Sequence, residues 1–245
     1  MAGRGRGGRP PAPAIDTVIR RATPGAGLRA AAALRAAAFA TNLPPSVSPL
    51  ARQAYMRMRY ADAWAALEAR VAGQDEDWRG VAVSVWLTTI PDDDADGGDG
   101  DAFTPSLASR VRAASGDAST ALVAGAGADP PPPTRALAVG TLDTNLGARL
   151  PCEALVAPAP AGGSLLYLTN VAVSPAARRA GVASSLVAAA LTTPGAARVA
   201  VHVELANDGA AALYERLLGP AKAVETAAAA RAAGRPRRAL HWVDV

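Results

Sequence analysis

The sequence predicts an α/β domain in which helices flank a mixed, mostly antiparallel sheet. Strand-like and helix-like stretches alternate along the second half of the chain, and further strands stand near both ends, as in an antiparallel meander. The length of 245 residues and the 50% hydrophobic content are ample for a buried core. We therefore expect a single folded domain at residues 15–245, preceded by a basic segment at residues 1–14.

The first half of the chain is predicted to contain a strand, two helices and a second strand, at residues 17–22, 28–40, 52–71 and 81–90. Both strands are rich in β-branched residues, and the first helix is rich in alanine. In the second helix, Tyr55 and Met58 stand among charged residues. We expect these two side chains to belong to the core.

Residues 92–134 are predicted to be an insertion between the second and third strands. The stretch holds an acidic, Gly-rich run at 92–101 and four consecutive prolines at 130–133. Such a composition buries too little apolar surface to offset the entropy of ordering the chain. Most of the insertion is therefore expected to be disordered, and residues 107–123 are the part of it that could form a transient helix.

The second half of the chain alternates strands and helices. Strands are predicted at residues 136–142, 165–173, 198–204, 222–226 and 239–245, and helices at residues 182–191 and 208–218. The loop at 175–181, between a strand and a helix, ends in glycine. This alternation is typical of a sheet covered by helices.

Charge and composition argue against several classes of protein. The net charge of +4 arises from an Arg-rich N-terminus and an acidic loop, and no zinc finger or RNA-binding motif is visible, so nucleic acid is not the expected partner. No apolar run approaches the ~20 residues of a membrane span. Two histidines and one cysteine, Cys152, show no metal-ligand spacing, and a single cysteine forms no intramolecular disulfide. No Gly-x-Ser-x-Gly motif suggests a hydrolase.

Residues 178–183, Arg-Arg-Ala-Gly-Val-Ala, predict an anion-binding loop between a strand and a helix. Backbone N–H groups at a helix N-terminus point at one spot, where the helix dipole favours negative charge. Gly181 allows a phosphate to approach the backbone closely, and Arg178 and Arg179 add charge-assisted donors. A basic helix start with a glycine turn would have the same sequence, so this loop alone does not decide the function.

A second motif follows the next predicted strand, where Asn207 precedes an Ala-rich helix that contains the pair Leu213–Tyr214. The two motifs together resemble the GNAT superfamily of N-acetyltransferases. The cofactor loop of that family has the pattern Arg/Gln-x-x-Gly-x-Gly/Ala, which Arg178, Gly181 and Ala183 match. The resemblance implies a single GNAT domain that uses acetyl-CoA as cosubstrate and no metal.

The resemblance also implies roles for particular residues. A splay of the sheet after Val173 would expose backbone groups to the pantetheine arm, the loop at 178–183 would hold the pyrophosphate, and Asn207 would bond near the pantetheine end. Tyr214 would be the general acid that protonates the departing CoA thiolate. The residues assigned to the cofactor are Val171, Ala172, Val173, Arg178, Arg179, Ala180, Gly181, Val182, Ala183 and Asn207.

The general base is predicted on the strand at 198–204. His202 has the one type of side chain whose ordinary pKa lies near neutrality, and it shares a strand face with Glu204, the substitute base. Some N-terminal acetyltransferases of the superfamily order a water with a Tyr and with a His five positions before the motif Asn, and Tyr167 and His202 match these positions. Ordinary packing of both side chains stays equally open. His241 is expected to be structural.

A finer resemblance is to the plastid-type GNATs of plants and green algae, through residues 140–153 and 167–171. It implies a protein or peptide acceptor, acetylated at an N-terminal α-amine or a lysine ε-amine, and a chloroplast location. The Arg-rich start is compatible with a transit peptide. It is short for a plastid presequence, so a cytoplasmic location stays open. A small-molecule amine acetyltransferase and a non-catalytic module that holds acyl-CoA are the alternative functions.

Overall fold

The computed structural model describes residues 17–39, 44, 46–91, 107–115, 120–124, 133–148, 155–158 and 160–245. The segment at 1–14, the acidic run at 92–101 and Cys152 lie outside the described residues, so the expectations for them are not addressed by the structure. In the described part of the chain, no helix has both the length and the apolar character needed to cross a membrane.

The helices are α1 (Ala26–Phe39), α2 (Pro49–Val71), α3 (Leu107–Ser115), α4 (Val182–Leu191), α5 (Asp208–Leu218) and α6 (Ala227–Ala232), with short 3-10 turns at η2 (Glu76–Trp78) and η5 (Pro175–Ala177). The strands are β1 (Val18–Arg21), β2 (Ala82–Pro91), β3 (Thr120–Ala124), β4 (Pro133–Leu146), β5 (Ser164–Val173), β6 (Ala196–Glu204), β7 (Ala223–Val224) and β8 (Arg238–Asp244).

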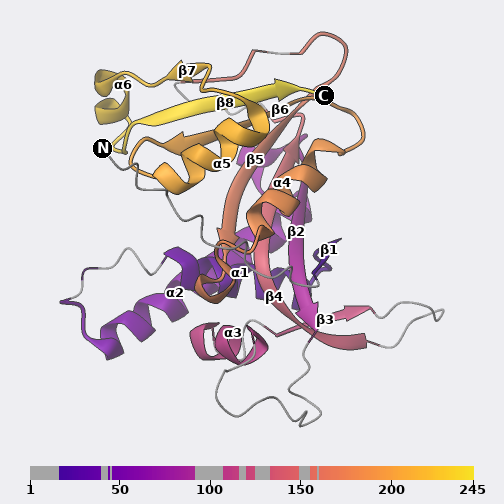
Figure 1. Ribbon diagram of the computed structural model, residues 1–245, viewed down its shortest axis with the longest axis vertical. Coiled ribbons are helices and arrows are strands. Elements are labelled where there is room, and N and C mark those ends of the chain that lie inside the picture. Colours follow the sequence, from indigo (N-terminus) through magenta and orange to yellow (C-terminus); the bar gives the residue numbers. More distant parts are fainter. Residues whose placement is uncertain are drawn as a thin grey trace, which may run out of the picture.

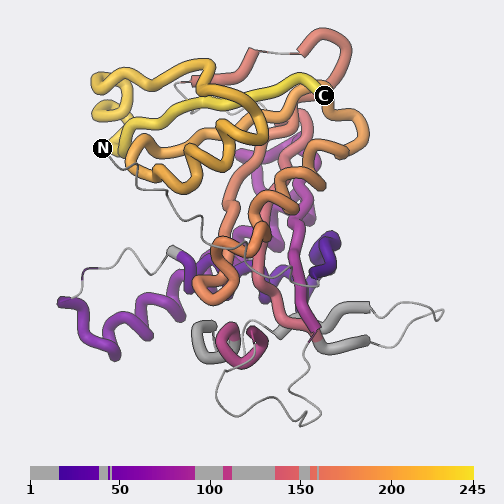
Figure 2. Tube along the Cα trace, viewed as in Figure 1, coloured from indigo at the N-terminus to yellow at the C-terminus, as the bar shows by residue number. Residues whose placement is uncertain are grey.

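All described strands form one mixed sheet in the order β1-β2-β4-β5-β6-β8-β7, and β3 pairs with β4 off this path. β5 and β6 are parallel, whereas the other described neighbours are antiparallel. In the chain trace, the C-terminal strand β8 returns to lie beside β6 (Figure 2). The structure confirms the predicted α/β fold with a mixed, mostly antiparallel sheet.

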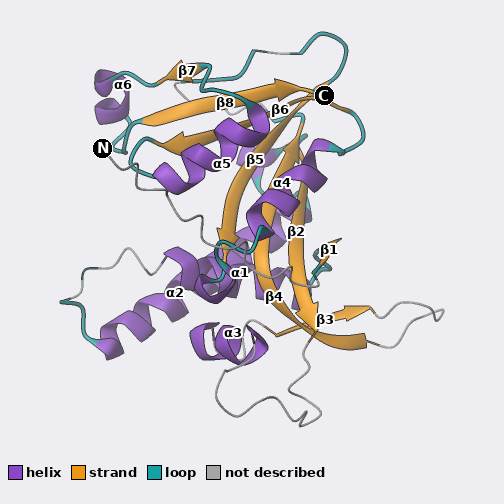
Figure 3. Cartoon of the chain, viewed as in Figure 1, coloured by secondary structure: helices purple, strands orange, loops and turns teal. Residues whose placement is uncertain are grey.

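Helices cover both faces of the sheet, with α1 and α2 on one face and α4 and α5 on the other (Figures 1 and 3). Strand β4 shows why both faces are apolar. Leu137 and Val139 pack in the core beneath α4 and α5, whereas Ala136 and Ala138 pack against α1. Because successive side chains of a strand point to opposite faces, β4 is buried on both sides.

Two elements that lie wholly inside the predicted insertion are among the described residues, α3 and β3. Helix α3 lies in the stretch where a helix could form, whereas β3 was not predicted. Ala108 and Val111 of α3 are buried in the core beneath α4 and α5. Helix α3 also packs against η5, the turn that leads into the loop at 178–183.

The expectation for α2 was wrong in one respect. Tyr55 is 36% exposed and Met58 is 54% exposed, so neither is a core residue. Leu67, near the other end of the helix, is buried together with the inner face of α1. The N-terminal turns of α2 reach out past the sheet (Figure 1), and Tyr55 lines a cavity together with Arg35 and Ala36 of α1 instead of packing in the core.

Candidate functional site

The site is built around a break in the sheet between β5 and β6. Their parallel pairing begins at Ser164 and ends at Leu168, which lies opposite Val201. β5 continues to Val173, so Thr169–Val173 have no sheet partner on the β6 side of these two fully described strands. The splay therefore begins before Val173, earlier than the sequence predicted. It opens a wedge that reaches into the middle of the sheet.

A cavity of about 660 Å³ occupies this wedge. Val171, Ala172 and Val173 line it from β5, and Glu204 and Asn207 line it from the opposite side. The cofactor contacts expected of these residues stay a prediction. The N–H and C=O groups on a strand edge without a neighbour need partners. The β5 edge of the wedge can therefore pair with an extended ligand that carries amide groups.

The wedge leads to the N-terminus of α4. Gly181 caps this helix with φ of 83°, in the left-handed region, and no side chain caps the helix. Ser185 donates its N–H to the carbonyl of Gly181 at 3.0 Å, so the N–H groups of Val182, Ala183 and Ser184 precede the first helical hydrogen bond. An ideal Cβ at Gly181 would meet no atom within 4 Å, so the helix end faces open space.

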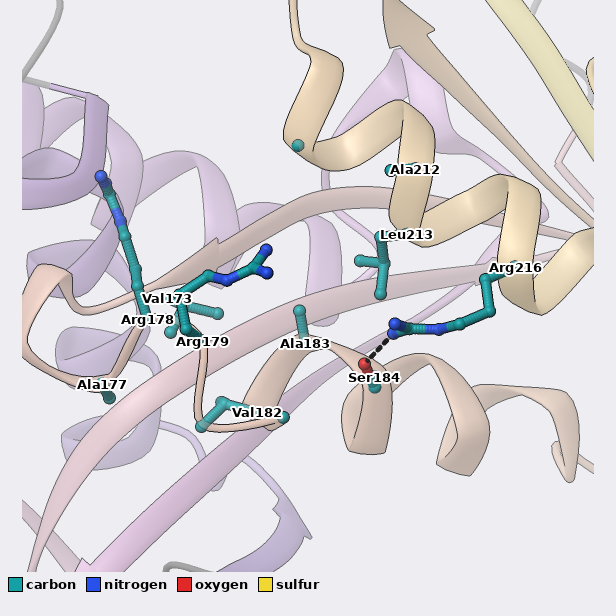
Figure 4. Close-up of a pocket in the computed structure, with 12 residues that line it drawn as sticks. Val173, Ala177, Arg178, Arg179, Val182, Ala183, Ser184, Ala212, Leu213 and Arg216 are labelled. Atoms are coloured by element: carbon teal, nitrogen blue, oxygen red, sulfur yellow. Dashed lines mark hydrogen bonds between the residues drawn. The ribbon is translucent and has the colours of Figure 1, made fainter. Parts of the chain in front are cut away.

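A second cavity, of about 450 Å³, lies over this helix end. It shares Val173, Arg178 and Gly209 with the wedge, so the two cavities adjoin. Its charged lining residues are Arg178, Arg179 and Arg216, and no acidic residue is part of the described lining. Arg179 and Arg216 reach toward the pocket from opposite sides, whereas Arg178 extends away from α4 (Figure 4). The arrangement fits an anion such as a pyrophosphate.

Arg216 is a residue of this pocket that the sequence motifs missed. Its Nη2 atom donates to Oγ of Ser184 at 2.7 Å, which ties α5 to the first turn of α4 (Figure 4). Arg216 and Ala212 are one helical turn apart and both line the pocket. The sequence signal for Arg216 was a basic residue four positions after Ala212, on the same face of α5.

Asn207 serves as the N-cap of α5. Its Oδ1 atom accepts a hydrogen bond from the N–H of Ala210 at 3.1 Å. The Nδ2 amide group of Asn207 takes no part in this cap. Asn207 also lines the wedge. Asn207 therefore has a structural role as a helix cap, and its place beside the cofactor arm stays a prediction.

Tyr214, the predicted general acid, is 4% exposed and lies in the core between α5 and the sheet. It lines neither of the two cavities, but it follows Ala210, a wedge residue, by one helical turn. Burial raises the pKa of the Tyr214 phenol above its usual value, which keeps the proton that an acid must donate. Its ring centroid is 6.3 Å from that of His241, which hydrogen-bonds through Nδ1 to the carbonyl of Gly219 at 3.0 Å.

Tyr167 and His202 lie next to the last paired residues of β5 and β6 and line a small cavity of their own, which neither shares with the wedge. The Tyr167 hydroxyl hydrogen-bonds to Nδ1 of His202, and the ring centroids are 5.4 Å apart. His202 directly follows Val201, the last β6 residue that pairs with β5. Tyr167 packs in a cluster with Ala200 and Leu240, separate from the core beneath α4 and α5. The structure thus brings the two predicted residues together, and their catalytic role stays a prediction.

Glu204, the substitute base, lies at the open end of the wedge beside Asn207 and is exposed. Across the portion of the chain that the structure describes, no three His, Cys, Asp or Glu side chains gather in a group that could hold a metal ion.

Comparison with known proteins finds a family model that matches part of the chain. Residues 122–219 match the model of the acetyltransferase (GNAT) family. The match spans the wedge strand β5, the loop at 178–183 and α5 with Asn207 and Tyr214. The fold is therefore that of a single GNAT domain, and the matched segment, 98 of the 245 residues, is similar to acetyltransferases of this family.

Solved structures with a similar arrangement include Arabidopsis thaliana NAA60 in complex with a bisubstrate analogue, at 13% identity and a TM-score of 0.47, covering 93% of this chain and 97% of that one. NAA60 in complex with acetyl-CoA gives 13% identity, a TM-score of 0.46 and coverage of 94% and 98%. The NatC complex bound to Gag peptide and CoA gives 10% identity, a TM-score of 0.46 and coverage of 94% and 99%. No curated protein matches the chain.

Proposed function

We propose that this chain transfers the acetyl group of acetyl-CoA to a primary amine of a protein, either an N-terminal α-amine or a lysine ε-amine. The observation that carries the proposal is the wedge between β5 and β6, which adjoins an arginine-lined helix N-terminus. Acetyl-CoA has the matching chemistry, because it joins an amide-rich pantetheine arm to a pyrophosphate. The two adjoining cavities supply a strand edge for the arm and backbone N–H groups for the phosphates.

The binding roles follow from the lining of the two cavities. The pyrophosphate would accept hydrogen bonds from the N–H groups at the start of α4 and from Arg179 and Arg216. The pantetheine arm would run along Val171–Val173, opposite Asn207. The thioester would then reach the narrow end of the wedge. Tyr214 packs in the core on one face of the sheet, and Tyr167, which hydrogen-bonds to His202, packs in the cluster on the other face.

The reaction is a direct attack of the amine on the thioester carbonyl. A C–N bond forms, and collapse of the tetrahedral intermediate breaks the C–S bond. The amine loses a proton to a water that His202 and Tyr167 would order, because an ammonium group has no free electron pair for attack. Tyr214 would donate its proton to the departing sulfur, and its raised pKa suits a group that must stay protonated until that step.

We also propose that the acceptor is a protein and that the chain works in the chloroplast. The support is the sequence resemblance to plastid-type GNATs at residues 140–153 and 167–171, together with the hydrogen bond between Tyr167 and His202. Imaging of the tagged chain in plant or algal cells tests the compartment. A cytoplasmic signal would contradict the chloroplast proposal and leave the proposed chemistry untouched.

Two measurements test the proposed function. Calorimetry with acetyl-CoA measures binding, and mass spectrometry of peptides, proteins and small amines incubated with the purified chain identifies the acceptor. We expect tight binding and acetylation of protein α-amines or ε-amines. Transfer to small amines alone would make the chain a small-molecule acetyltransferase. Binding without transfer would make it a non-catalytic acyl-CoA module.

A further inference from the structure

We infer that a buried ion pair between Arg35 of α1 and Asp143 of β4 positions the β5 wall of the wedge through Asn170. This inference rests on the proposed function, because it takes the wedge as the acetyl-CoA site. Arg35, Asp143 and Asn170 are thus positioning residues, which act on the cosubstrate through the backbone of Val171–Val173.

The three side chains form a continuous hydrogen-bonded connection that is buried at Arg35 and Asp143. Nη2 of Arg35 pairs with Oδ1 of Asp143 and also donates to Oγ1 of Thr141 at 3.2 Å. Nδ2 of Asn170 donates to the other carboxylate oxygen, Oδ2, at 2.8 Å. Arg35 is 5% exposed and Asp143 is 2% exposed. Charged side chains are buried this deeply only when they are paired and hydrogen-bonded. Both carboxylate oxygens of Asp143 meet this condition.

The connection meets β5 at a bulge. Thr141 lies opposite Ala172 and Asp143 lies opposite Thr169, so Asn170 and Val171 together face the single residue Leu142. Asn170 has φ of 53°, a left-handed conformation that residues other than glycine rarely adopt. The hydrogen bond to Asp143 fixes the side chain of the residue that makes this turn. Val171, the first wedge residue, follows directly.

This wall needs support because β6 has already separated from it. From Thr169 onward, β5 is paired with β4 alone. Asn145 of β4 secures the strand before the bulge, where its Nδ2 atom donates to the carbonyl of Tyr167 at 2.8 Å and to Oγ1 of Thr169 at 3.1 Å. Asp143 secures the bulge itself. Loss of the Asp143 connection therefore frees the strand edge that pairs with the pantetheine arm.

Arg35 and Asn170 also line a cavity of about 290 Å³ between α1 and α2. On β5 the wedge lining begins at Val171, directly after Asn170, and Ala38 of α1 also lines the wedge. The ion pair thus links α1 to the wall of the cosubstrate cavity.

The test compares acetyl-CoA affinity among variants of the full chain by calorimetry. Asn170→Gly keeps a residue that tolerates the left-handed conformation but removes the hydrogen bond, and Asp143→Asn keeps the shape but removes the charge. We expect each to raise the dissociation constant about tenfold, the equivalent of about 1.4 kcal/mol. Arg35→Lys should bind better than Arg35→Met, because it keeps the charge beside Asp143.

Glu225→Gln is the matched control. It breaks another buried ion pair, in which Nη1 of Arg235 lies 2.7 Å from Oε2 of Glu225, outside β4 and β5. We expect this variant to lower the melting temperature while acetyl-CoA affinity stays unchanged. If Asp143→Asn does not fold, Asn170→Gly still gives the answer.

Three outcomes would overturn the inference. Wild-type affinity in Asn170→Gly, measured beside a wild-type chain that binds, would show that the connection does not position the wedge. An equal loss of affinity in Glu225→Gln at equal melting temperature would show that any destabilisation has the same effect. A wild-type chain that does not bind acetyl-CoA would overturn the proposed function, and the inference with it.

Discussion

Substitutions at Gly181 can distinguish the effect of an added charge on acetyl-CoA binding from the effect of an added side chain of the same size. Because an ideal Cβ there meets no atom within 4 Å, the folded state loses no packing when a side chain is added. The cost to folding is left-handed strain, about 1–2 kcal/mol for an ordinary residue and less for Asn and Asp. Gly181→Asn and Gly181→Asp should therefore fold with similar melting temperatures, although only the second adds a negative charge.

The two variants should differ widely in acetyl-CoA affinity. If the phosphates lie against the N–H groups of Val182 and Ala183, a carboxylate at Gly181 stands about 5 Å from negative charge, and at an effective dielectric constant of about 20 the repulsion is roughly 3 kcal/mol. That energy corresponds to roughly a hundredfold weaker binding by Gly181→Asp than by Gly181→Asn. Salt screens exposed charges, so the gap should narrow at high ionic strength.

Calorimetric titration of both variants with acetyl-CoA, at low and high salt, measures the difference. Gly181→Ala is the control for strain without a polar group. Equal affinities of Gly181→Asp and Gly181→Asn would refute the assignment of phosphates to this helix end. A gap that does not change with salt would show that the effect is not electrostatic.

Four further changes test the remaining parts of the site and the core. Tyr214→Phe should lower kcat by about 10²–10⁴-fold with little change in acetyl-CoA affinity, and an unchanged kcat would show that Tyr214 is not the acid. Because burial raises the pKa of the phenol, deprotonation of Tyr214 should cause no loss of wild-type activity up to about pH 10. His202→Ala should weaken the acidic limb of the pH–rate profile, and the double variant with Tyr167→Phe should be scarcely worse than either single variant if both act on one water. Additive losses would indicate independent roles. Arg216→Met should weaken acetyl-CoA binding by about tenfold or more in calorimetry, as loss of a charged hydrogen bond does, whereas unchanged affinity would limit this residue to its bond with Ser184. Val111→Ala should lower the free energy of unfolding by about 2 kcal/mol in denaturant titration, because α3 belongs to the core, and a negligible loss would contradict that packing.

The sequence predicted the elements whose signals are local. The bounds of α4 and α5 agree with the prediction because Gly181 and Asn207 stand at their N-caps and Ala-rich stretches follow. Helix α6 was missed because it has only six residues, and its start depends on a cap in which Oγ1 of Thr226 accepts from Ala229. Helix propensity in so short a stretch is a weak signal.

The same distinction holds for the site. The loop at 178–183 is one contiguous motif, so the sequence shows it directly. The connection of Arg35, Asp143 and Asn170 joins residues 108 and 27 positions apart, and such pairs leave no periodic pattern. Each of these residues, taken alone, has the appearance of an ordinary surface residue.

The open edge at Thr169–Val173 has a thermodynamic consequence. It leaves backbone amides facing a cavity, where solvent exchanges their hydrogens, and a bound pantetheine arm would protect them as a neighbouring strand does. A ligand that completes the sheet in this way binds the folded chain and not the unfolded one, so its concentration shifts the folding equilibrium by mass action. At a hundred times its dissociation constant, such a ligand adds about 2.7 kcal/mol. The lifetime of the folded enzyme would then follow the supply of its own cosubstrate.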